Sequence, residues 1–584
     1  MPGGLLSLVC YGNENVILNG NPQVTWFYKT FLRHTHFSQE PIQISLEGPN
    51  ILQMDAPILV KAKIPRQGDL LSDLVLRIQV PDIFSKAYVS TDISGAYILD
   101  RAAEFAWVRQ VGVRMIQSIT FTIGGQKIQE FTSDWISARA ALDLDATQYS
   151  KWRYMVGDTP EMFDPANGVY GDPSGEYPQY PNVLAWRGSQ YLPNPVQNNA
   201  PSIPGRILRV PLGLWFSDYI ENSLPLVSLQ YHDCEIQILL RPIRELYTVL
   251  DLKGNRVRPG VQTLPPEPTD QYTSVWNRNY YGDLPPSLNN LYGAGDMSGV
   301  RMKDFLTDIS GAVPFQEGWP LNASLEATYT FVTSEEQRMF VQKTLRYTVR
   351  QVQNFMYSGV TSRDTYELDV HNIATRLVYF ARRSDAIPFR NQSLNLTNWM
   401  YPTKSQRPFV FPSIAQSGGG RIPLVPKTVL VGRTMDLSGQ LVGGTLRPIG
   451  YSGLNIPGLQ RRILRNMFLQ ANGQPLFNSQ DSAYFTEYVP YKYLHGAAAP
   501  FADYGLATQT EMWPIYSYSF SLNGSSVEQP KGTLNTSRID NFNMDVDVEP
   551  IPTLANYTYE LQIFVETLNF MEITNGLGGL KFAK

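Results

Sequence analysis

Three carboxylates occupy every second position near the end of the sequence: Asp545, Asp547 and Glu549. In a β-strand, residues two apart point to the same face and lie about 6.6 Å apart. Such a row could hold a calcium ion or supply the acid pair of a glycoside hydrolase. The segment lacks the glycine and glutamate at the sixth and twelfth positions of a calcium loop. We therefore interpret the row as the solvated outer face of a strand.

The five histidines form no recognisable catalytic or metal-binding motif. They are His34, His36, His232, His371 and His495. His34 and His36 would share one face of a strand, an arrangement that metals accept, but we favour a packing or interface role for them. His232 and its neighbour Asp233 would point to opposite faces of a strand, so they predict no dyad. We predict no catalytic residue, cofactor site or metal site.

Nucleotide and nucleic-acid binding have little support. GxGxxG and GxxxxGK[ST] are absent, and the SGGGR segment at 417–421 lacks the strand and helix that a phosphate loop needs. Arg382-Arg383 and Arg461-Arg462 are isolated basic pairs, and the net charge is −4. We therefore expect no nucleic-acid partner.

Asn-x-Ser/Thr sequences occur about as often as chance allows in a chain rich in these residues. Two of them, Asn391 and Asn395, fall in a predicted loop and are our candidates for glycosylation.

Composition favours a large β-protein in a reducing compartment. Only 17% of the 584 residues are charged, while 43% are apolar, with 44 glycines, 42 prolines and 33 tyrosines. The two cysteines, Cys10 and Cys234, cannot frame a secreted protein of this size. The apolar start lacks the basic region of a signal peptide, so we predict an N-terminal arm over 1–25 that lies on a partner or a lipid surface.

The elements that must position these residues are mostly strands. Apolar and polar residues alternate over 73–80, 233–240, 516–522, 542–548 and 559–565, which predicts strands with one face on a core. The helical signal is strongest at Ser334, where Gln337 three residues later suggests a capping box. Glycines in SITFTIGGQKIQEF (118–131) and the Asn-Gly of RNMFLQANGQPLFN (465–478) predict two similar hairpins.

These hairpins belong to a longer internal repeat. Four types of segment recur in one order on either side of the helix at 334–343, which favours one β-domain used twice. We predict an all-β fold of two consecutive eight-stranded jelly-roll sandwiches, at 26–333 and 344–584. Long loops are expected at about 140–206, 245–322 and 384–460.

Six motifs in order resemble the double jelly-roll major capsid proteins of nucleocytoplasmic large DNA viruses. They are the opening NPQVTWF with RHTHF, IGGQKI followed by DW, LPLVSLQYHDCEIQI, YTFVTSEEQRMFVQ, TLNTSRIDNFNMDV and NGLGGLKF. The linker helix departs from the family's arginine-rich pattern, because only Arg338 remains. The motif positions to which the resemblance assigns structural roles are Asn21, Pro22, Arg33, His34, Gly124, Gly125, Trp135, Tyr231, His232, Asn535, Ser537, Arg538, Asp540, Gly578 and Gly579.

The resemblance implies a structural protein with no enzymatic activity. Three chains would form a trimer whose six sandwiches give a pseudo-hexagonal capsomer, and capsomers would tile an icosahedral shell assembled in the host cytoplasm. Expected partners are neighbouring capsomers, minor capsid or cement proteins beneath them, and the inner membrane face through the arm. We expect Asn535 to make structural hydrogen bonds, and Arg538 and Asp540 to form an ion pair within the domain or across a subunit seam.

Two other functions stay open. A minor capsid or scaffolding protein of the same fold would differ in its copy number in the virion. A carbohydrate-active β-sandwich would bind glycans through Asp545 or Asp547.

Overall fold

The computed structural model describes most of the chain. The described residues are 3–84, 87–91, 97–101, 104–163, 201–250, 256–260, 302–306, 319–399, 428–431, 434–435, 441–442, 445–448, 460–496, 514–525, 528–551 and 557–582. The SGGGR segment at 417–421 lies outside them.

The first half of the chain forms two facing antiparallel sheets. One has the order β1 (Phe37–Ser45), β16 (Ala323–Val332), β4 (Leu70–Val80) and β10 (Arg206–Pro211), with the short β11 (Leu224–Pro225) also on β4. The other has the order β3 (Ile58–Lys63), β12 (Cys234–Leu240), β8 (Ile116–Ile123) and β9 (Gln126–Thr132). We call this pair of sheets the first sandwich.

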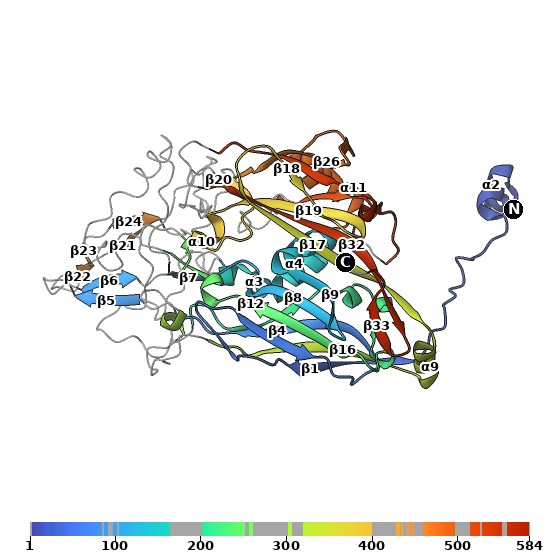
Figure 1. The fold of residues 1–584 in the computed structure, drawn as a ribbon, viewed down its shortest axis with the longest axis horizontal. Coiled ribbons are helices and arrows are strands. Elements are labelled where there is room, and N and C mark those ends of the chain that lie inside the picture. Colours follow the sequence, from blue (N-terminus) through green and yellow to red (C-terminus); the bar gives the residue numbers. More distant parts are fainter. Residues whose placement is uncertain are drawn as a thin grey trace.

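The second half repeats the arrangement. Its first sheet has the order β17 (Leu345–Val360), β32 (Tyr559–Thr574), β19 (Ile373–Arg383) and β29 (Tyr516–Ser519), joined by β30 (Leu534–Asn535) on β19 and β33 (Leu577–Leu580) on β32. Its second sheet has the order β18 (Asp364–Glu367), β31 (Phe542–Val548), β26 (Leu464–Ala471) and β27 (Gln474–Pro475), with β28 (Gln480–Asp481) also on β26. This is the second sandwich, which lies above the first in Figure 1.

The two sandwiches are equivalent strand by strand. In each, the first strand pairs with the last, and the last pairs with the third, as a jelly roll requires. Both also carry a bulge at the same place, where Ser72 of β4 and Thr375 of β19 are skipped in the ladder. The Ser72 hydroxyl donates to the carbonyl of Thr328, and the Thr375 hydroxyl donates to that of Glu566. The prediction of one fold used twice is confirmed.

The two predicted hairpins are also confirmed. Gly124 and Gly125 have φ of 57° and 80°, and Asn472 and Gly473 have φ of 50° and 79°. Positive φ at both central residues gives the turn the twist of its flanking strands, which is why glycine and asparagine occur there.

The helix between the sandwiches, α9, spans Ser334–Gln342. Its N-cap is Thr333, and Ser334 is the first helical residue. The expected capping box is therefore wrong: the Gln337 side chain donates to Asp69 at 3.0 Å and bonds the first sandwich.

The long loops predicted from the sequence contain regular structure. Residues 140–163 fall largely in the helices α4 (Ser133–Asp143), α5 (Ala146–Met155) and α6 (Pro160–Phe163). The second expected loop contributes β13 (Tyr247–Leu250), which pairs with β7 (Glu104–Trp107), and β14 (Arg256–Val257), which pairs with β13. The third contributes α10 (Ala386–Arg390) and β20 (Thr397–Trp399), which pairs with β25 (Gln460–Arg462). These short elements lack the long alternation on which the prediction depended.

Insertions from both halves meet at one end of the molecule. There β5 (Ala87–Thr91) and β6 (Tyr97–Arg101) share a sheet with β22 (Thr434–Met435) and β23 (Leu441–Val442). Beside them, β21 (Thr428–Val431) pairs with β24 (Thr445–Pro448). This end lies opposite α9 in Figure 1.

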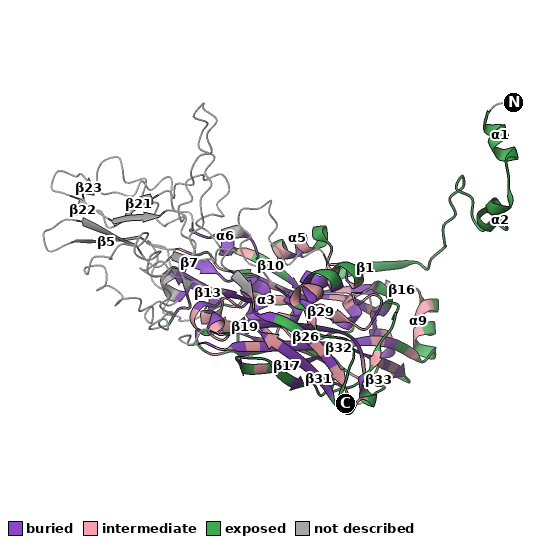
Figure 2. Ribbon diagram, turned by 90° about the horizontal axis from the view of Figure 1, so that it is seen from above, coloured by how far each residue is buried: buried purple, intermediate pink, exposed green. Residues whose placement is uncertain are grey.

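The N-terminal arm projects away from both sandwiches (Figure 2). It contains α1 (Gly3–Val9) and α2 (Asn13–Asn19), and every residue from 3 to 40 is exposed. The arm reaches the first strand only at Phe37, so it is longer than the expected 1–25. Among the described residues, no helix has the length and apolar character needed to cross a membrane.

Candidate functional site: the junction between the sandwiches

The edge strands β9 and β17 bring the two sandwiches together. The buried side-chain amide of Gln129 donates to the carbonyl of Arg350 at 2.9 Å, and that of Gln351 donates to the carbonyl of Ile128 at 2.8 Å. The two glutamines thus satisfy backbone acceptors on each other's strand. Unpaired edge carbonyls would cost free energy when buried, so this exchange lets two sheet edges meet without forming a ladder.

Helix α4 fills the space behind this contact and lies between the sandwiches (Figure 1). Its Trp135 is 2% exposed, and its ring centroid lies 5.5 Å from that of Phe564 on β32. Val378 and Phe380 of β19 belong to the same hydrophobic core as the first sandwich. The outer face of the sheet β17-β32-β19-β29 is therefore an interior surface of the protein.

Six charged side chains, none of them more than 20% exposed, cluster at the centre of the junction. They are Arg139, Asp143 and Asp218 from the first half, and Arg350, Arg376 and Glu566 from the second. Three guanidinium groups face three carboxylates, so the formal charges cancel. A buried cluster is tolerated only when its charges are paired in this way.

Arg376 makes the most direct bridge between the halves. Its Nη1 and Nη2 donate to the two carboxylate oxygens of Asp143 at 2.5 and 2.7 Å, while its Nε donates to Glu566 at 3.1 Å. The Arg376 and Glu566 side chains are both 0% exposed. Arg350 contacts Asp218 and Glu566 on the other side of the cluster.

Neighbouring opposite charges keep Asp143 and Arg376 in their charged forms. Burial acts to raise the pKa of Asp143, but Arg376, Arg139 and Arg350 together hold that pKa below its usual value. Burial acts to lower the pKa of Arg376, and Asp143 and Glu566 raise it above its usual value. A general acid or base needs a pKa near the working pH, so this cluster is suited to binding the halves together and not to proton transfer.

A second, smaller group of charges lies at the start of α4. Asp134 is 3.3 Å from Arg114 and 3.7 Å from Arg382, whose Nε also donates to Glu560 at 3.3 Å. Burial acts to raise the pKa of Asp134, but Arg382 and Arg114 hold it below its usual value. Arg382, which the sequence presents as half of an isolated basic pair, is thus part of the interior.

The C-terminal hairpin of β32 and β33 crosses back onto the first sandwich. The Nδ1 atom of His232 lies 2.9 Å from the carbonyl oxygen of Gly578 and 3.3 Å from its amide nitrogen. A Cβ on Gly124 would lie 2.6 Å from the His232 ring, so the hairpin turn can approach only as glycine. The amide of Leu580 donates to the side chain of Gln126.

Several motif residues therefore meet at this hairpin. Tyr231 lies against Gly576, where a Cβ would be 2.7 Å from its ring, and a Cβ on Gly579 would be 3.1 Å from the Gln126 side chain. Gly125 has open space around it, so only its positive φ calls for glycine. Residues separated by more than 300 positions in the sequence share one contact.

The SRID segment stabilises the second sandwich. The Ser537 hydroxyl accepts from the amide of Asn372, and Asn535 pairs with Ile373 through the backbone in β30. Arg538 and Asp540 are exposed, and the described residues show no ion pair between them. The expected pair within the domain is therefore wrong, and a role at a subunit seam stays a prediction.

Two of the three carboxylates in the row, Asp545 and Glu549, are ion-paired, and the row is only partly solvated. The apolar residues of β31 point into the core as predicted. Asp545 is 9% exposed and accepts from Arg363 at 2.9 Å and from Thr365 at 3.2 Å, while Glu549 accepts from Arg465 at 2.6 Å. These cross-strand pairs explain the acidic face without a metal, and no group of acidic, histidine or cysteine side chains suited to a metal occurs in the described part of the chain.

The remaining motif residues lie in the arm. Asn21, Pro22, Arg33 and His34 are all exposed there. His34 and His36 precede β1, so the expectation that they share a strand face is wrong.

The structure contradicts glycosylation at Asn391 and Asn395. The two residues are 6% and 1% exposed. The Asn391 amide donates to the carbonyls of Arg244 and Tyr247 at 2.7 Å, and the Asn395 amide donates to Gln392. The side-chain nitrogens to which a glycan would be attached are therefore hydrogen-bonded inside the folded protein.

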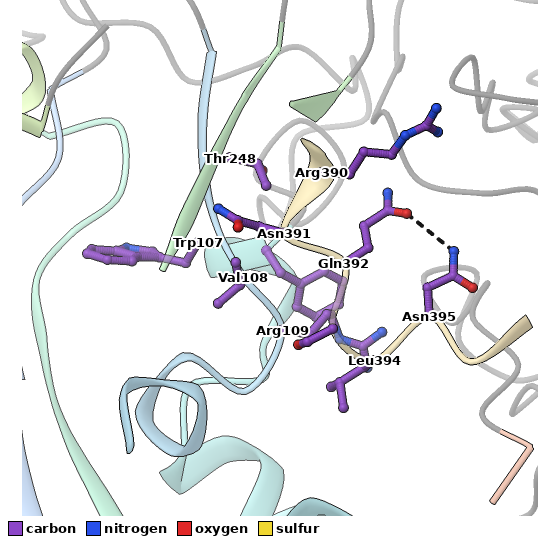
Figure 3. A pocket seen from close by; sticks show the side chains of 11 residues that line it. Trp107, Val108, Arg109, Thr248, Arg390, Asn391, Gln392, Leu394 and Asn395 are labelled. Carbon is purple, nitrogen blue, oxygen red and sulfur yellow. Dashed lines mark hydrogen bonds between the residues drawn. The ribbon is translucent and has the colours of Figure 1, made fainter. Parts of the chain in front are cut away.

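Both asparagines line a small cavity, shown in Figure 3 with Trp107, Val108 and Thr248. Its volume is about 30 Å³. That is room for one or two water molecules, far below the several hundred Å³ that a substrate or cofactor needs.

The duplicated jelly roll, whose two sandwiches are joined by buried packing and paired charges, defines a structural building block. Two family models match consecutive parts of the chain: "Major capsid protein N-terminus" over residues 25–278 and "Large eukaryotic DNA virus major capsid protein" over 336–579. The chain belongs to the major capsid protein family of large eukaryotic DNA viruses, whose members are structural proteins and not enzymes.

Some curated relatives align with the chain over its full length. The major capsid protein of Phaeocystis pouchetii virus is 24% identical over 614 aligned residues, covering 100% of both chains. Among solved structures, the PBCV-1 virus capsid has a TM-score of 0.55 at 17% identity, covering 96% of this chain and 100% of that one. The Faustovirus major capsid protein has a TM-score of 0.56 at 13% identity, covering 97% and 94%. At these identities the structures support the fold.

Sequence reasoning missed the central charges Asp143, Arg376 and Glu566. A signal was present, because IATRLVYFARR is apolar on both faces and not alternating. A strand buried on both faces predicts that any charge within it is paired.

Proposed function

We propose that three copies of this chain form a trimeric capsomer that tiles an icosahedral virus shell. The observation that carries the proposal is the strand-by-strand equivalence of the two sandwiches, down to the shared bulge. A closed ring of three chains has threefold symmetry, and two equivalent units per chain give it six similar sides. A pseudo-hexagonal particle can fill a sixfold position in a shell.

Sedimentation and electron microscopy test this proposal. The purified protein should sediment near three times 65.9 kDa at micromolar concentration. Negative-stain images should show hexagonal particles. A stable monomer under these conditions contradicts the proposal.

We propose that the arm contacts what lies beneath the shell. The arm exposes large apolar side chains: Trp26 is 90% exposed, Phe27 99% and Leu32 94%. Exposure of apolar surface to water is unfavourable, and a partner surface would cover it. The partners proposed are minor capsid or cement proteins and the inner membrane face. Assembly would take place in the host cytoplasm, next to other capsomers and away from the genome.

Deletion of residues 1–36 tests the arm. The truncated chain keeps β1 whole, so it should still form trimers but fail to assemble into a lattice. Loss of the folded trimer would show that the arm belongs to the capsomer itself. A copy number far below that of other virion proteins would favour a minor capsid or scaffolding role for the whole chain.

A further inference from the structure

Equivalent sheet faces have different surroundings in the two sandwiches. In the second sandwich, Val378 and Phe380 on the outer face of β19 are 0% and 3% exposed, because the first sandwich covers them. The shared bulge makes Val75 and Arg77 of β4 their equivalents. Both are only partly buried, and Asp73 on the same face contacts Ser217, which follows β10.

The second sandwich carries the counterparts of the covering elements. Helix α4 follows β9, and in the same way the helical pair η9 (Tyr484–Tyr488) and α11 (Val489–Tyr493) follows β27 and β28. Trp135 of α4 is 2% exposed, whereas Tyr491 of α11 is 87% exposed.

The same contrast holds after the fourth strand of each first sheet. Trp215 follows β10 and is 1% exposed, whereas Leu522 follows β29 and is 76% exposed. The second strands of the two equivalent hairpins show the same difference. Ile128 on β9 is 0% exposed, and its equivalent Leu476, directly after β27, is 41% exposed. The second sandwich thus presents apolar side chains to solvent where the first sandwich buries them.

We infer that Leu476, Tyr488, Tyr491 and Leu522, here the apolar patch, cover the outer face of the sheet β1-β16-β4-β10 in a second copy of this chain. The contact repeats the internal junction, so three such contacts would close a ring of six sandwiches. The inference rests on the proposed trimer and names the surfaces that form it.

Charged residues also favour this pairing. Compared with the internal junction, the acid and the base have exchanged places between the helix and the sheet. At the internal junction, Asp143 at the end of α4 meets Arg376 of β19. The equivalent of Arg376 is Asp73, and α11 carries Lys492 near its end. An acid on the sheet can therefore meet a base on the helix, and we expect an ion pair between Lys492 and Asp73 of the neighbouring copy.

The exchange of glutamines is not repeated. Gln351 corresponds to Glu40, and Gln129 corresponds to Phe477. Glutamate cannot donate to a carbonyl, and phenylalanine has no donor. The contact between copies is more apolar than the junction within a chain, so trimers should dissociate before the sandwiches of one chain separate.

Two substitutions test the surfaces separately. Val75→Asp changes the outer face of the sheet β1-β16-β4-β10 and Tyr491→Asp changes the apolar patch. Leu59→Asp is the matched control, because Leu59 is 42% exposed but lies on β3 in the other sheet of the first sandwich. In sedimentation, the wild type and the control should be trimers, and the other two variants should be monomers with an unchanged circular dichroism spectrum.

The outcomes separate the two proposals. If the wild type, Val75→Asp and Tyr491→Asp are all trimers, the inference is wrong and the trimer stands. If the wild type is a monomer, both are wrong. Should a variant fail to fold, carbodiimide coupling of mixed isotope-labelled wild-type copies decides: links from Lys492 to Asp73 of another copy support the inference, and links confined to one copy overturn it.

Discussion

The two sandwiches share their topology and differ in the chemistry of one sheet face. At the position after the bulge, the first sandwich has Asp73 on a partly exposed face, and the second has Arg376 in the buried cluster. Duplication preserved the strand order and the Ser72 and Thr375 hydrogen bonds. Divergence of outward-facing side chains decided which of the two faces became interior.

Breaking the buried cluster should have the largest effect. Arg376→Ala removes the nearest arginine from Asp143 and one of the two arginines that contact Glu566, and it should lower the free energy of unfolding by about 3–5 kcal/mol. Urea titration of the variant and the wild type measures this loss in the free energy of unfolding. The control Arg346→Ala removes an exposed pair with Glu572, so it should change stability by less than about 1 kcal/mol. Equal losses would mean that burial does not decide the strength of these pairs.

Acid should weaken the first half through its buried carboxylates. Burial acts to raise the pKa of Asp158, but Arg109 and Arg153 lower it to about 2. Because the pKa is lower in the folded state, the stabilisation is present above about pH 4 and is lost as the pH falls towards 2. The loss should be about 2 kcal/mol. Urea titrations from pH 6 to 2 should show a smaller fall in Asp158→Asn, and an identical fall would contradict the assignment.

The hairpin contact can be isolated with two neighbouring glycines. Gly124→Ala and Gly125→Ala both impose a positive φ on alanine, at about 1–2 kcal/mol each. Only Gly124 faces the His232 ring, so its substitution should cost roughly 1–3 kcal/mol more in thermal or urea unfolding. If both variants lose the same stability, the C-terminal hairpin does not depend on the close approach.

Substitutions at the shared bulge should have the smallest effects on stability, and they compare equivalent positions of the two sandwiches directly. Ser72→Ala should cost about 1 kcal/mol, because it removes one hydrogen bond from a buried hydroxyl. Thr375→Val keeps the side-chain shape and should cost somewhat more, since that hydroxyl also lies 3.2 Å from the Glu566 carboxylate. Urea titration of both variants checks the order. A reversed order would show that the two bulges are not energetically equivalent.

Local patterns predicted the parts of the fold that are set by local physics. Strands such as β4, β12 and β31 alternate along the sequence, and the Gly124-Gly125 and Asn472-Gly473 turns require positive φ. The linker helix was found, although its cap was assigned one residue late. The helices α4 and α5 were missed because their amphipathic pattern is weak: α4 is buried almost all round between the two sandwiches.

The sequence by itself determined the strand periodicity, the order of the segments and their repetition, since each depends on neighbouring residues. The tertiary structure alone decided that Asp143 meets Arg376 and that His232 meets Gly578, because these pairs are hundreds of positions apart. It also decided that Asn391 and Asn395 are buried in a segment that reads as a polar loop. Charge pairs form only when separate elements pack, so a local pattern can indicate that a strand is buried but cannot name the partner of each charge.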